Sequence, residues 1–374
     1  MADAAVRILR VDGQVGGIVI APIAVSVAPL ESIAAGHPTP NAASERAGRR
    51  ALEIARSTAR NDLLLVLLSG GASALMAAPA EGVSVAEKSA TTARLLEAGA
   101  DIHSLNTVRK HLSAVKGGWL AAAAAAPCHT FAISDVVGDD PSVIASGPTV
   151  GDATTFEQAL AVLEEFGGAR SYPPSVVSHL EAGARGAIPE TPKPDDERLA
   201  RARTIVIGGR RNAMDGAAHE AETRGYHVLQ IDDAVVGEAR TTAVSHVRAV
   251  LARAASIGRP VCIISSGETT VRVAGRGKGG RNQEFALASA ALLHETPLSA
   301  LASVGTDGVD GPTDAAGAIV DSTTMTRAEK AGASNPARYL DNNDSYTFFT
   351  RLGDLVKTGP TGTNVGDLQV ILLA

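Results

Sequence analysis

The chain has 374 residues, of which 45% are hydrophobic, 3% aromatic and 20% charged, and its formal net charge is -6. This length exceeds the usual size of one hydrophobic core and favours two domains, while the negative charge argues against nucleic acid as a general partner. The two cysteines give neither a disulfide framework nor a metal spacing, and the most apolar run, Trp119 to Ala126, is too short to span a membrane. We therefore expect a cytoplasmic protein that acts on small molecules.

Strands and helices are expected to alternate along the first half of the chain. Six consecutive apolar residues, Leu63 to Leu68, are typical of a strand covered on both faces in a parallel sheet. His37 lies in a turn whose prolines prevent a helix from starting until the turn is passed. It is either an active-site residue or an ordinary turn histidine. The pattern predicts strands at 17–27, 63–68 and 131–134 and helices at 44–59 and 156–166.

The segment after the 63–68 strand is the first candidate anion contact. Ser69, Gly70, Gly71 and Ser73 follow that strand at its carboxyl end, where open α/β sheets bind their ligands. The segment predicts a phosphate cradle, although the lysine of a Walker loop is missing.

A stripe of polar and basic side chains is the second candidate anion contact. A helix over 106–119 would present one polar face, formed by Asn106, Arg109, Ser113 and Lys116. This face is either solvated or an anion contact, and the helix-destabilising Gly117 and Gly118 favour close approach of backbone or a ligand. A long loop with Asp135, Asp139, Asp140 and Asp152 then follows the 131–134 strand, and such loops commonly carry function.

The proline-rich, charged stretch at 189–197 predicts a domain boundary. We expect a Rossmann-like domain over 1–190 and a second α/β domain over 200–374. Both should contain largely parallel sheets flanked by helices. Strands in the second domain are predicted at 204–209, 226–233, 261–268, 301–304 and 368–373.

A glycine-rich basic loop, Gly275 to Arg281, precedes an apolar helix that should begin near Asn282. Its glycines, at 275, 277, 279 and 280, would let backbone N–H groups crowd round an anion at φ values closed to other residues. The positive end of the helix would add to this attraction. The alternative is a flexible basic surface loop. If the loop binds phosphate, Arg281 can aim a bidentate donor at a transferring phosphoryl group, and Arg281→Ala should keep its melting temperature.

An acidic loop over 305–317 carries Asp307, Asp310 and Asp314 among glycines and threonines. Oxygen ligands of this kind suit Mg²⁺, and we expect Asp307 or Asp314 to hold the metal. The loop at 359–367, with Thr361 and Asn364, is either a third anion or metal contact or a turn. A basic loop, an acidic loop and a metal are the components of phosphoryl transfer.

Several motifs occur in an order that resembles the glycerate 2-kinase family, whose C-terminal part is called the MOFRL domain. They are SGGASAL, NTVRKHLSAVKGG, ISDVVGDDPSVIASGPT, SSGETTV, GRGKGGRNQEFAL, GTDGVDGPTDAAGA and GPTGTNV. The resemblance implies ATP-dependent phosphorylation of D-glycerate to 2-phosphoglycerate with Mg²⁺, at an active site in the cleft between two α/β domains. It allows a homodimer.

The patterns above, taken together with the resemblance, give candidate roles to individual residues. Catalytic roles fall on Arg281, Asp307 and Lys116, and metal binding on Asp307 and Asp314. Substrate or phosphate binding falls on Ser69, Gly70, Gly71, Ser73, Asn106, Arg109, Lys110, Asp135, Lys278, Gly279, Gly280, Glu284, Thr361 and Asn364.

Two alternatives accompany this interpretation. Family members begin with a further strand and a GKAA motif whose lysine acts at the active site, and Met1 matches a position just after it. The resemblance then implies either a start codon assigned too far downstream or a shortened form that only binds phosphorylated ligands.

The second alternative is a reductase. Some members are named hydroxypyruvate reductase, which uses NAD(P)H. The candidate nicotinamide site at 205–218 has Arg211 where the third glycine or alanine of GxGxxG belongs.

Overall fold

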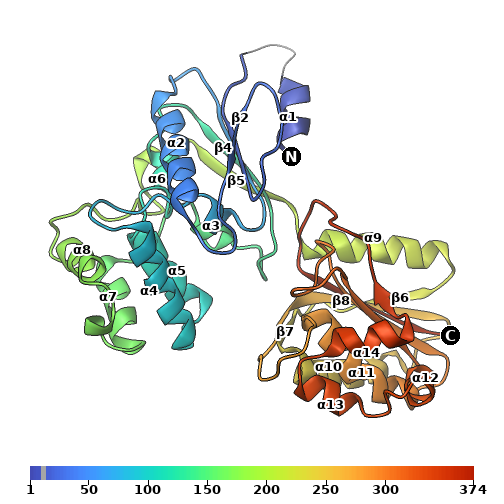
Figure 1. Ribbon diagram of the computed structural model, residues 1–374. Coiled ribbons are helices and arrows are strands. Elements are labelled where there is room, and N and C mark those ends of the chain that lie inside the picture. The colour runs from blue at the N-terminus through green and yellow to red at the C-terminus, as the bar shows by residue number, and fades with distance from the viewer. Residues whose placement is uncertain (10–13) are drawn as a thin grey trace. The chain divides into compact units, whose positions relative to one another are not determined.

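The structure is a computed structural model that describes residues 1–9 and 14–374. The chain forms two compact units (Figure 1). Unit 1 consists of residues 1–132 and 139–207, and unit 2 of residues 133–138 and 208–374. The boundary lies later than the proline-rich stretch at 189–197, because the strand after that stretch still pairs with the sheet of the first unit.

Unit 1 contains two small sheets surrounded by helices. Its elements in chain order are α1 (Ala2–Leu9), β1 (Ile18–Ala21), β2 (Glu31–Ala34), α2 (Ala42–Ser57), β3 (Leu64–Leu68), α3 (Ala72–Leu75), α4 (Val85–Glu97), α5 (Ile102–His111), α6 (Trp119–Ala122), β4 (Cys128–Ile133), η1 (Ile144–Ser146), α7 (Phe156–Glu165), η2 (Ala169–Ser171), α8 (Pro174–Ala184), η3 (Glu197–Leu199) and β5 (Ala202–Gly208).

The central strand of the larger sheet in unit 1 is β4. It pairs in parallel with β3, and β5 lies on its other side, while β1 and β2 form a separate parallel pair. Helix α2 begins at a capping box formed by Asn41 and Ser44. Its apolar face packs against the sheet, where Leu52 joins Leu64 and Cys128 in one buried cluster. The predicted strand at 63–68, its parallel pairing and the predicted helix at 44–59 are confirmed.

The predicted continuous helix over 106–119 is wrong. Helix α5 ends at His111, and α6 begins only at Trp119. Between them Gly117 and Gly118 adopt φ of 56° and 86°, left-handed values that glycine reaches without a steric penalty. The two glycines therefore turn the chain.

Unit 2 is built around one sheet. Its elements are α9 (Arg210–Thr223), β6 (His227–Gln230), β7 (Val235–Glu238), α10 (Ala239–Ala254), β8 (Val261–Thr270), α11 (Arg281–His294), β9 (Ser299–Gly305), β10 (Gly317–Asp321), α12 (Thr324–Lys330), α13 (Pro336–Asp341), α14 (Ser345–Leu352), β11 (Leu355–Val356) and β12 (Asp367–Leu373).

The 7-stranded sheet of unit 2 has the order β11-β10-β9-β12-β8-β6, and β7 also pairs with β8. Strands β6 and β7 run parallel to β8. Strand β12 runs antiparallel to both β8 and β9, and β10 is antiparallel to β9 and β11. The α/β class with flanking helices is confirmed, and β10 and β12 are the strands that oppose the common direction.

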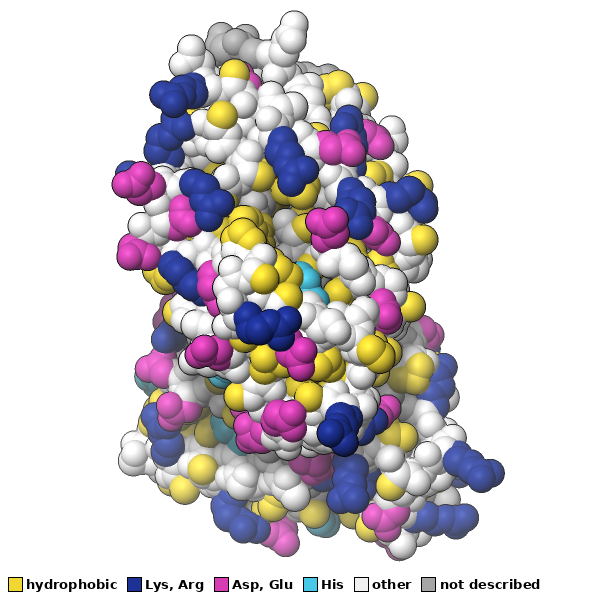
Figure 2. Space-filling model, turned by 90° about the vertical axis from the view of Figure 1, so that its left-hand side faces the viewer, with side chains coloured by type: hydrophobic (Ala, Val, Ile, Leu, Met, Phe, Trp, Pro, Cys, Tyr) yellow, Lys and Arg dark blue, Asp and Glu magenta, His cyan; other side chains and the backbone are white. Residues whose placement is uncertain are grey.

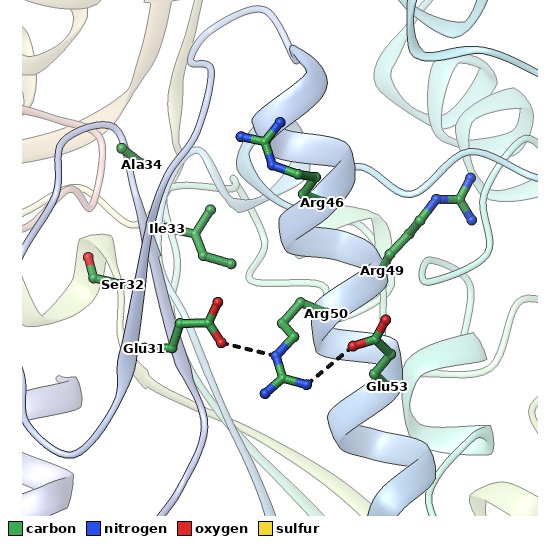
Figure 3. Close-up of a pocket in the computed structure, with 8 residues that line it drawn as sticks. All are labelled: Glu31, Ser32, Ile33, Ala34, Arg46, Arg49, Arg50 and Glu53. Carbon is green, nitrogen blue, oxygen red and sulfur yellow. Dashed lines mark hydrogen bonds and ion pairs between the residues drawn. The ribbon is translucent and has the colours of Figure 1, made fainter.

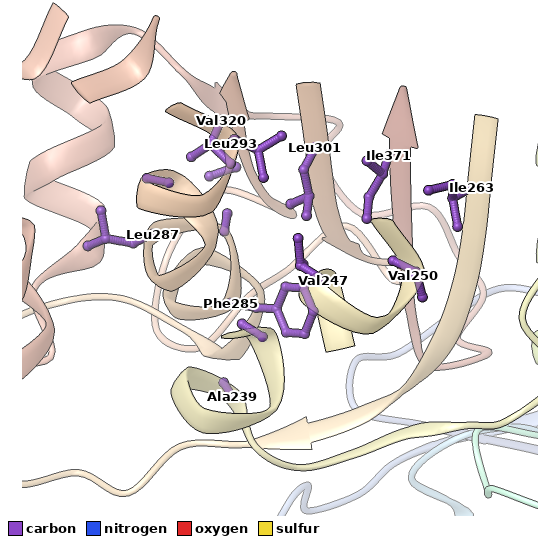
Figure 4. Close-up of a cluster of buried hydrophobic side chains, with 14 of the residues drawn as sticks. Ala239, Val247, Val250, Ile263, Phe285, Leu287, Leu293, Leu301, Val320 and Ile371 are labelled. Carbon is purple, nitrogen blue, oxygen red and sulfur yellow. The ribbon is translucent and has the colours of Figure 1, made fainter. Parts of the chain in front are cut away.

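Helices cover both faces of this sheet. On one face, α10 and α11 bury Val247 and Phe285 against strand residues such as Ile371 (Figure 4). On the other face, α9 buries Met214 against Ile264. The loops at the strand ends are thus held by a sheet with a core on each side.

The face drawn in Figure 2 carries acidic and basic side chains interspersed with apolar ones. Such a mixture produces no extended field of one sign. Within residues 1–9 and 14–374, no helix combines the length and the apolar character needed to cross a membrane.

Candidate functional site

Unit 1 gathers three cationic side chains, which we call the cation group: Lys88 of α4, Arg109 of α5 and Lys116 of the turn before α6. Lys116 is 1% exposed and Lys88 7%, and Arg109 is partly buried. The Lys116 ammonium donates to Ser73 O at 3.0 Å, to Ser73 Oγ at 2.9 Å and to Ala145 O at 3.2 Å. Lys88 Nζ donates to Leu112 O at 2.9 Å. All of these acceptors are neutral.

In the described part of the chain, no carboxylate forms an ion pair with the cation group. Burial lowers the pKa of Lys116 well below its usual value, and repulsion from Lys88 and Arg109 lowers it further. Burial and the charge of Arg109 lower the pKa of Lys88 to about 7. Burial also lowers the pKa of Arg109. An anion among these side chains would relieve both desolvation and repulsion.

A chain of hydrogen bonds leads away from Lys116. Its ammonium donates to Ser73 Oγ, which lies 3.0 Å from Ser146 Oγ, and Ser146 Oγ donates to Asn106 Oδ1 at 2.9 Å. The amide nitrogen Nδ2 of Asn106 is buried and has no acceptor among the described residues. A buried donor without an acceptor is destabilising, so its presence beside three cations indicates a site for an anionic ligand.

The backbone that supplies this site is strained. Ala145, Ser146 and Gly147 adopt φ of 53°, 60° and 61° in succession, and a non-glycine residue in this region costs roughly 1–3 kcal/mol. The strained segment brings Ala145 O to Lys116 and the Ser146 hydroxyl to Ser73. Ser146 was not among the candidates from the sequence. The signal that points to it is the long loop after β4, which predicted function without naming this residue.

Lys110, another candidate in unit 1, has a structural partner. The predicted phosphate contact Lys110 donates to Asp152 at 3.3 Å in a buried ion pair. Burial alone would raise the pKa of Asp152, but Lys110 and hydrogen bonds from Thr154 lower it overall. The turn of Ser69, Gly70 and Gly71 follows β3 as predicted.

Unit 2 contains the opposite arrangement, which we call the acid group: Glu268, Asp310 and Asp367 around Arg281. Arg281 Nε donates to both carboxylate oxygens of Asp367 at 2.9 Å, and Nη1 lies 3.2 Å from Glu268 Oε1. The Asp367 side chain is fully buried. Burial raises the pKa of Asp367 although Arg281 opposes this rise, and burial with the charges of Asp135 and Asp367 raises the pKa of Glu268.

The N-terminus of α11 binds a carboxylate of the chain itself. Asp310 accepts from the N–H groups of Asn282 at 3.0 Å and Gln283 at 2.9 Å. Burial raises the pKa of Asp310 to about 6 despite these hydrogen bonds. The sequence predicted that an external anion would accept hydrogen bonds from the N–H groups at this helix end. Asp310 accepts two of them instead. Within the described chain, the N–H groups of Gly279, Gly280 and Arg281 have no hydrogen-bond acceptor.

The glycines of the basic loop were predicted to adopt φ values closed to other residues, and this prediction is wrong. None of Gly275, Gly277, Gly279 and Gly280 has a positive φ. A Cβ would lie 2.3 Å from Asn342 C at Gly275, 2.3 Å from Asp344 Cβ at Gly277 and 2.3 Å from Asp310 Cγ at Gly280. Glycine is needed here because the loop packs directly on the 342–345 segment and on Asp310.

Two further predicted contacts, Lys278 of the basic loop and Glu284 of α11, are also engaged within unit 2. The Glu284 side chain is buried, accepts from Arg240 Nε at 2.8 Å and from Asn343 Nδ2 at 2.7 Å. Asn343 Oδ1 accepts from the N–H groups of Ala274 and Gly275, each at 2.8 Å. Lys278 is exposed, with Nζ 4.5 Å from the ring centre of Tyr346. Glu284 therefore holds the loop in place through Asn343.

Known proteins resemble the chain over nearly all of its length. A family model described as "Domain of unknown function (DUF4147)" matches residues 1–181, and one described as "MOFRL family" matches residues 261–367. Glycerate 2-kinase from Pyrococcus horikoshii is 40% identical over 92% of this chain and 78% of that protein. The chain belongs to the glycerate kinase family. The crystal structure of glycerate kinase from Thermotoga maritima has a TM-score of 0.88 and 39% identity, and the match covers 100% of this chain and 88% of that one. A putative hydroxypyruvate reductase from Agrobacterium vitis is 40% identical over 97% of this chain and 82% of that protein.

The two aspartates predicted to hold metal differ in this glycerate kinase family member. Asp314 is exposed, accepts from Tyr346 Oη at 2.7 Å and pairs with Lys357 Nζ at 2.9 Å. Those contacts, led by that of Lys357, lower its pKa to about 2. Asp307 is partly buried, and its Oδ1 accepts from Val309 N at 2.9 Å.

The described residues contain no group of three or more His, Cys, Asp or Glu side chains placed to hold a metal ion. Mg²⁺ commonly binds through one or two carboxylates together with waters and substrate phosphates. A single aspartate such as Asp307 fits that use, whereas Asp314 is already engaged.

The last three candidates lie on neighbouring loops of unit 2. Asn364 Nδ2 donates to Asp135 Oδ2 at 3.1 Å. Thr361 Oγ1 donates to Thr306 O at 2.7 Å, and its N–H donates to Asp307 O at 3.1 Å. Thr361 thus braces the loop that carries Asp307, and Asn364 positions Asp135.

A hollow of about 540 Å³ lies elsewhere in unit 1, between β2 and α2 (Figure 3). Arg50 lines it and contacts Glu31 at 3.0 Å and Glu53 at 3.2 Å. Arg49 is bound to Glu45 at 2.7 Å. Because these charges largely neutralise one another, this hollow is a weaker candidate for an anion site than the cation group.

Proposed function

We propose that the chain transfers the γ-phosphoryl group of ATP to O2 of D-glycerate, giving ADP and 2-phosphoglycerate. The observation that supports this proposal is the cation group without a counter-charge, in a chain 40% identical to a glycerate 2-kinase. D-Glycerate and ATP are both anions, so their binding requires such positive charge.

In this proposal, the cation group binds an anionic substrate and Arg281 stabilises the transferring phosphoryl group. Arg281 is held by Asp367 and Glu268 through Nε and Nη1, which leaves Nη2 for a ligand. The bond between O2 and phosphorus forms as the bond from phosphorus to the ADP oxygen breaks, and the hydroxyl proton is released. Mg²⁺, when bound, neutralises phosphate charge, and Asp307 is the residue proposed to hold it.

Hydroxypyruvate reduction is the second candidate, because a relative carries that name. In a nicotinamide site, the carboxylate after the second strand binds the ribose. Here Asp232 Oδ1 accepts from Arg211 Nη2 at 2.5 Å, and Asp232 O accepts from Arg210 Nη2 at 2.5 Å. These contacts disfavour a nucleotide at that position. We also propose a cytoplasmic location, which the free Cys128 and Cys262 support. The homodimer stays a prediction.

The test measures both reactions on one preparation. The purified chain is mixed with D-glycerate, ATP and Mg²⁺ and coupled to enolase, which accepts only the 2-phosphate, while a parallel sample follows NADH oxidation with hydroxypyruvate. We expect enolase-coupled turnover that depends on all three additions. NADH oxidation without phosphorylation would replace the proposal by the reductase.

A further inference from the structure

We infer that the cation group is a subsite for a carboxylate, and that Arg109 binds the carboxylate of the 2-hydroxy acid. This inference rests on the proposed function for the identity of the acid. It assigns one functional group of the substrate to unit 1.

The donors of this subsite come from side chains. Arg109 forms no ion pair and no hydrogen bond with any described residue, although it is partly buried. Its guanidinium presents two parallel N–H groups, a geometry that matches a planar carboxylate. Asn106 Nδ2 is a second buried donor without an acceptor, on the same helix. A phosphate site would instead be expected to draw on backbone N–H groups.

The charge of the cation group also fits a monoanion. Arg109 keeps its proton at all ordinary pH values. Burial and the charge of Arg109 lower the pKa of Lys88 to about 7, so this lysine is partly neutral near pH 7. Burial and repulsion also lower the pKa of Lys116 well below its usual value. The group therefore carries fewer than three full positive charges near pH 7, which favours a carboxylate monoanion over a phosphate dianion.

The hydroxyl groups nearby are less available to a ligand. Ser146 Oγ donates to Asn106 Oδ1, and Lys116 donates to Ser73 Oγ. Their hydrogen bonds fix the Asn106 amide so that its oxygen accepts from Ser146 and its nitrogen has no acceptor among the described residues. The strained backbone at Ala145 and Ser146 maintains this arrangement.

The experiment measures binding by calorimetry without turnover. The unsubstituted chain, Arg109→Met, Arg109→Lys and the control Arg46→Met are each titrated with D-glycerate, with its neutral amide and with inorganic phosphate. Arg46 is an exposed arginine of α2 that lies outside the cation group and lines the hollow of Figure 3, so this variant also tests whether that hollow binds the anion. Thermal melts show which variants are folded, and Arg109→Gln replaces Arg109→Met if that variant does not fold.

We expect D-glycerate to bind about 10- to 100-fold more weakly to Arg109→Met, the range for loss of a hydrogen bond to a charged group. Arg109→Lys should fall between, Arg46→Met should match the unsubstituted chain, and the amide should bind poorly to all. Unchanged D-glycerate affinity in folded Arg109→Met, loss of phosphate binding alone, or no D-glycerate binding to the unsubstituted chain would overturn the inference.

These outcomes separate the subsite from the kinase reaction. D-Glycerate binding that depends on Arg109, without enolase-coupled turnover, supports the carboxylate subsite and contradicts the proposed kinase. Turnover with an unchanged KM for D-glycerate in Arg109→Met supports the kinase and contradicts the subsite.

Discussion

The cation group of unit 1 and the acid group of unit 2 manage buried charge in opposite ways. The cation group surrounds its lysines with neutral carbonyl and hydroxyl oxygens, whereas the acid group places carboxylates around a single guanidinium. Uncompensated buried charge destabilises a fold, and a paired charge destabilises it only when its partner is removed. Removing a cation of unit 1 should therefore lower activity with little loss of stability, whereas removing Arg281 in unit 2 should lower stability as well as activity.

The largest expected effect comes from Lys116→Met. The variant loses a charge aimed at the anionic substrate, and kcat/KM for phosphorylation should fall about 10²- to 10³-fold. The fold should survive, because burying an ammonium costs free energy that offsets its lost hydrogen bonds. Coupled kinetics and a thermal melt measure the two quantities, with Arg46→Met as the control. Full activity in Lys116→Met would show that the cation group takes no part in the reaction.

Arg281→Ala should destabilise unit 2 by roughly 3 kcal/mol, because the buried carboxylate of Asp367 loses its charged partner. This reverses the expectation from the sequence, in which Arg281 was a free donor and the melting temperature stayed constant. The double variant Arg281→Ala with Asp367→Asn should regain much of the stability. Denaturant unfolding of the single and double variants provides the test, and equal stability of Arg281→Ala and the unsubstituted chain would contradict the pairing.

Lys88→Met should stabilise the chain by roughly 2 kcal/mol near pH 7, since it removes a buried ammonium. The pKa of Lys88 is lowered to about 7 from 10.5, so the unfolded chain holds a proton that the folded chain releases. Its contribution to stability is complete above pH 10.5 and is lost as the pH falls through 7. The advantage of Lys88→Met should therefore shrink between pH 7 and 10.5.

The groups that act on Lys88 come from several elements. Arg109 on α5 repels it, its charge also acts on Lys116 and on His179 of α8, and its ammonium donates a hydrogen bond to Leu112 O. Unfolding measured at several pH values, with Lys330→Met as a surface control, tests the slope. A stability difference independent of pH would contradict the lowered pKa.

Asp314→Asn should have the smallest effect. Its carboxylate is exposed and bound to Lys357 and Tyr346, so both stability and the Mg²⁺ dependence of turnover should stay close to those of the unsubstituted chain. Asp307→Asn, by contrast, should raise the Mg²⁺ concentration needed for half-maximal rate. Titrations of Mg²⁺ for both variants compare them, and the reverse pattern would move the proposed metal contact to Asp314.

The strands of both units could be predicted because continuous apolar runs, such as Leu63 to Leu68 and Val261 to Ile264, indicate buried strands without further information. The roles of the glycines could not. Gly277 is glycine because Asp344, far along the chain, packs against it, and a local sequence pattern does not contain that contact.

The candidate site shows the same limit. Arg109 and Lys116 were chosen from a helical period that the chain does not follow beyond His111, and tertiary packing still brings both into the cation group. Asp310 was noted in the acidic loop but given no role of its own, and it caps α11, because the partner of a carboxylate depends on the fold. The residue types were predictable from the sequence, and most of their partners were not.

Strand β12 is the last strand of unit 2 in chain order, but it lies between β8 and β9 in the sheet. On the ribosome, β8 and β9 therefore emerge well before the strand that joins them, and each exposes an unpaired edge during that interval. Arg281 also lacks its ion-pair partner during that interval, because Asp367 is the first residue of β12. Emergence of residues 367–373 thus completes the sheet and the acid group in one step, and the time before it sets how long the incomplete unit is open to aggregation or chaperones.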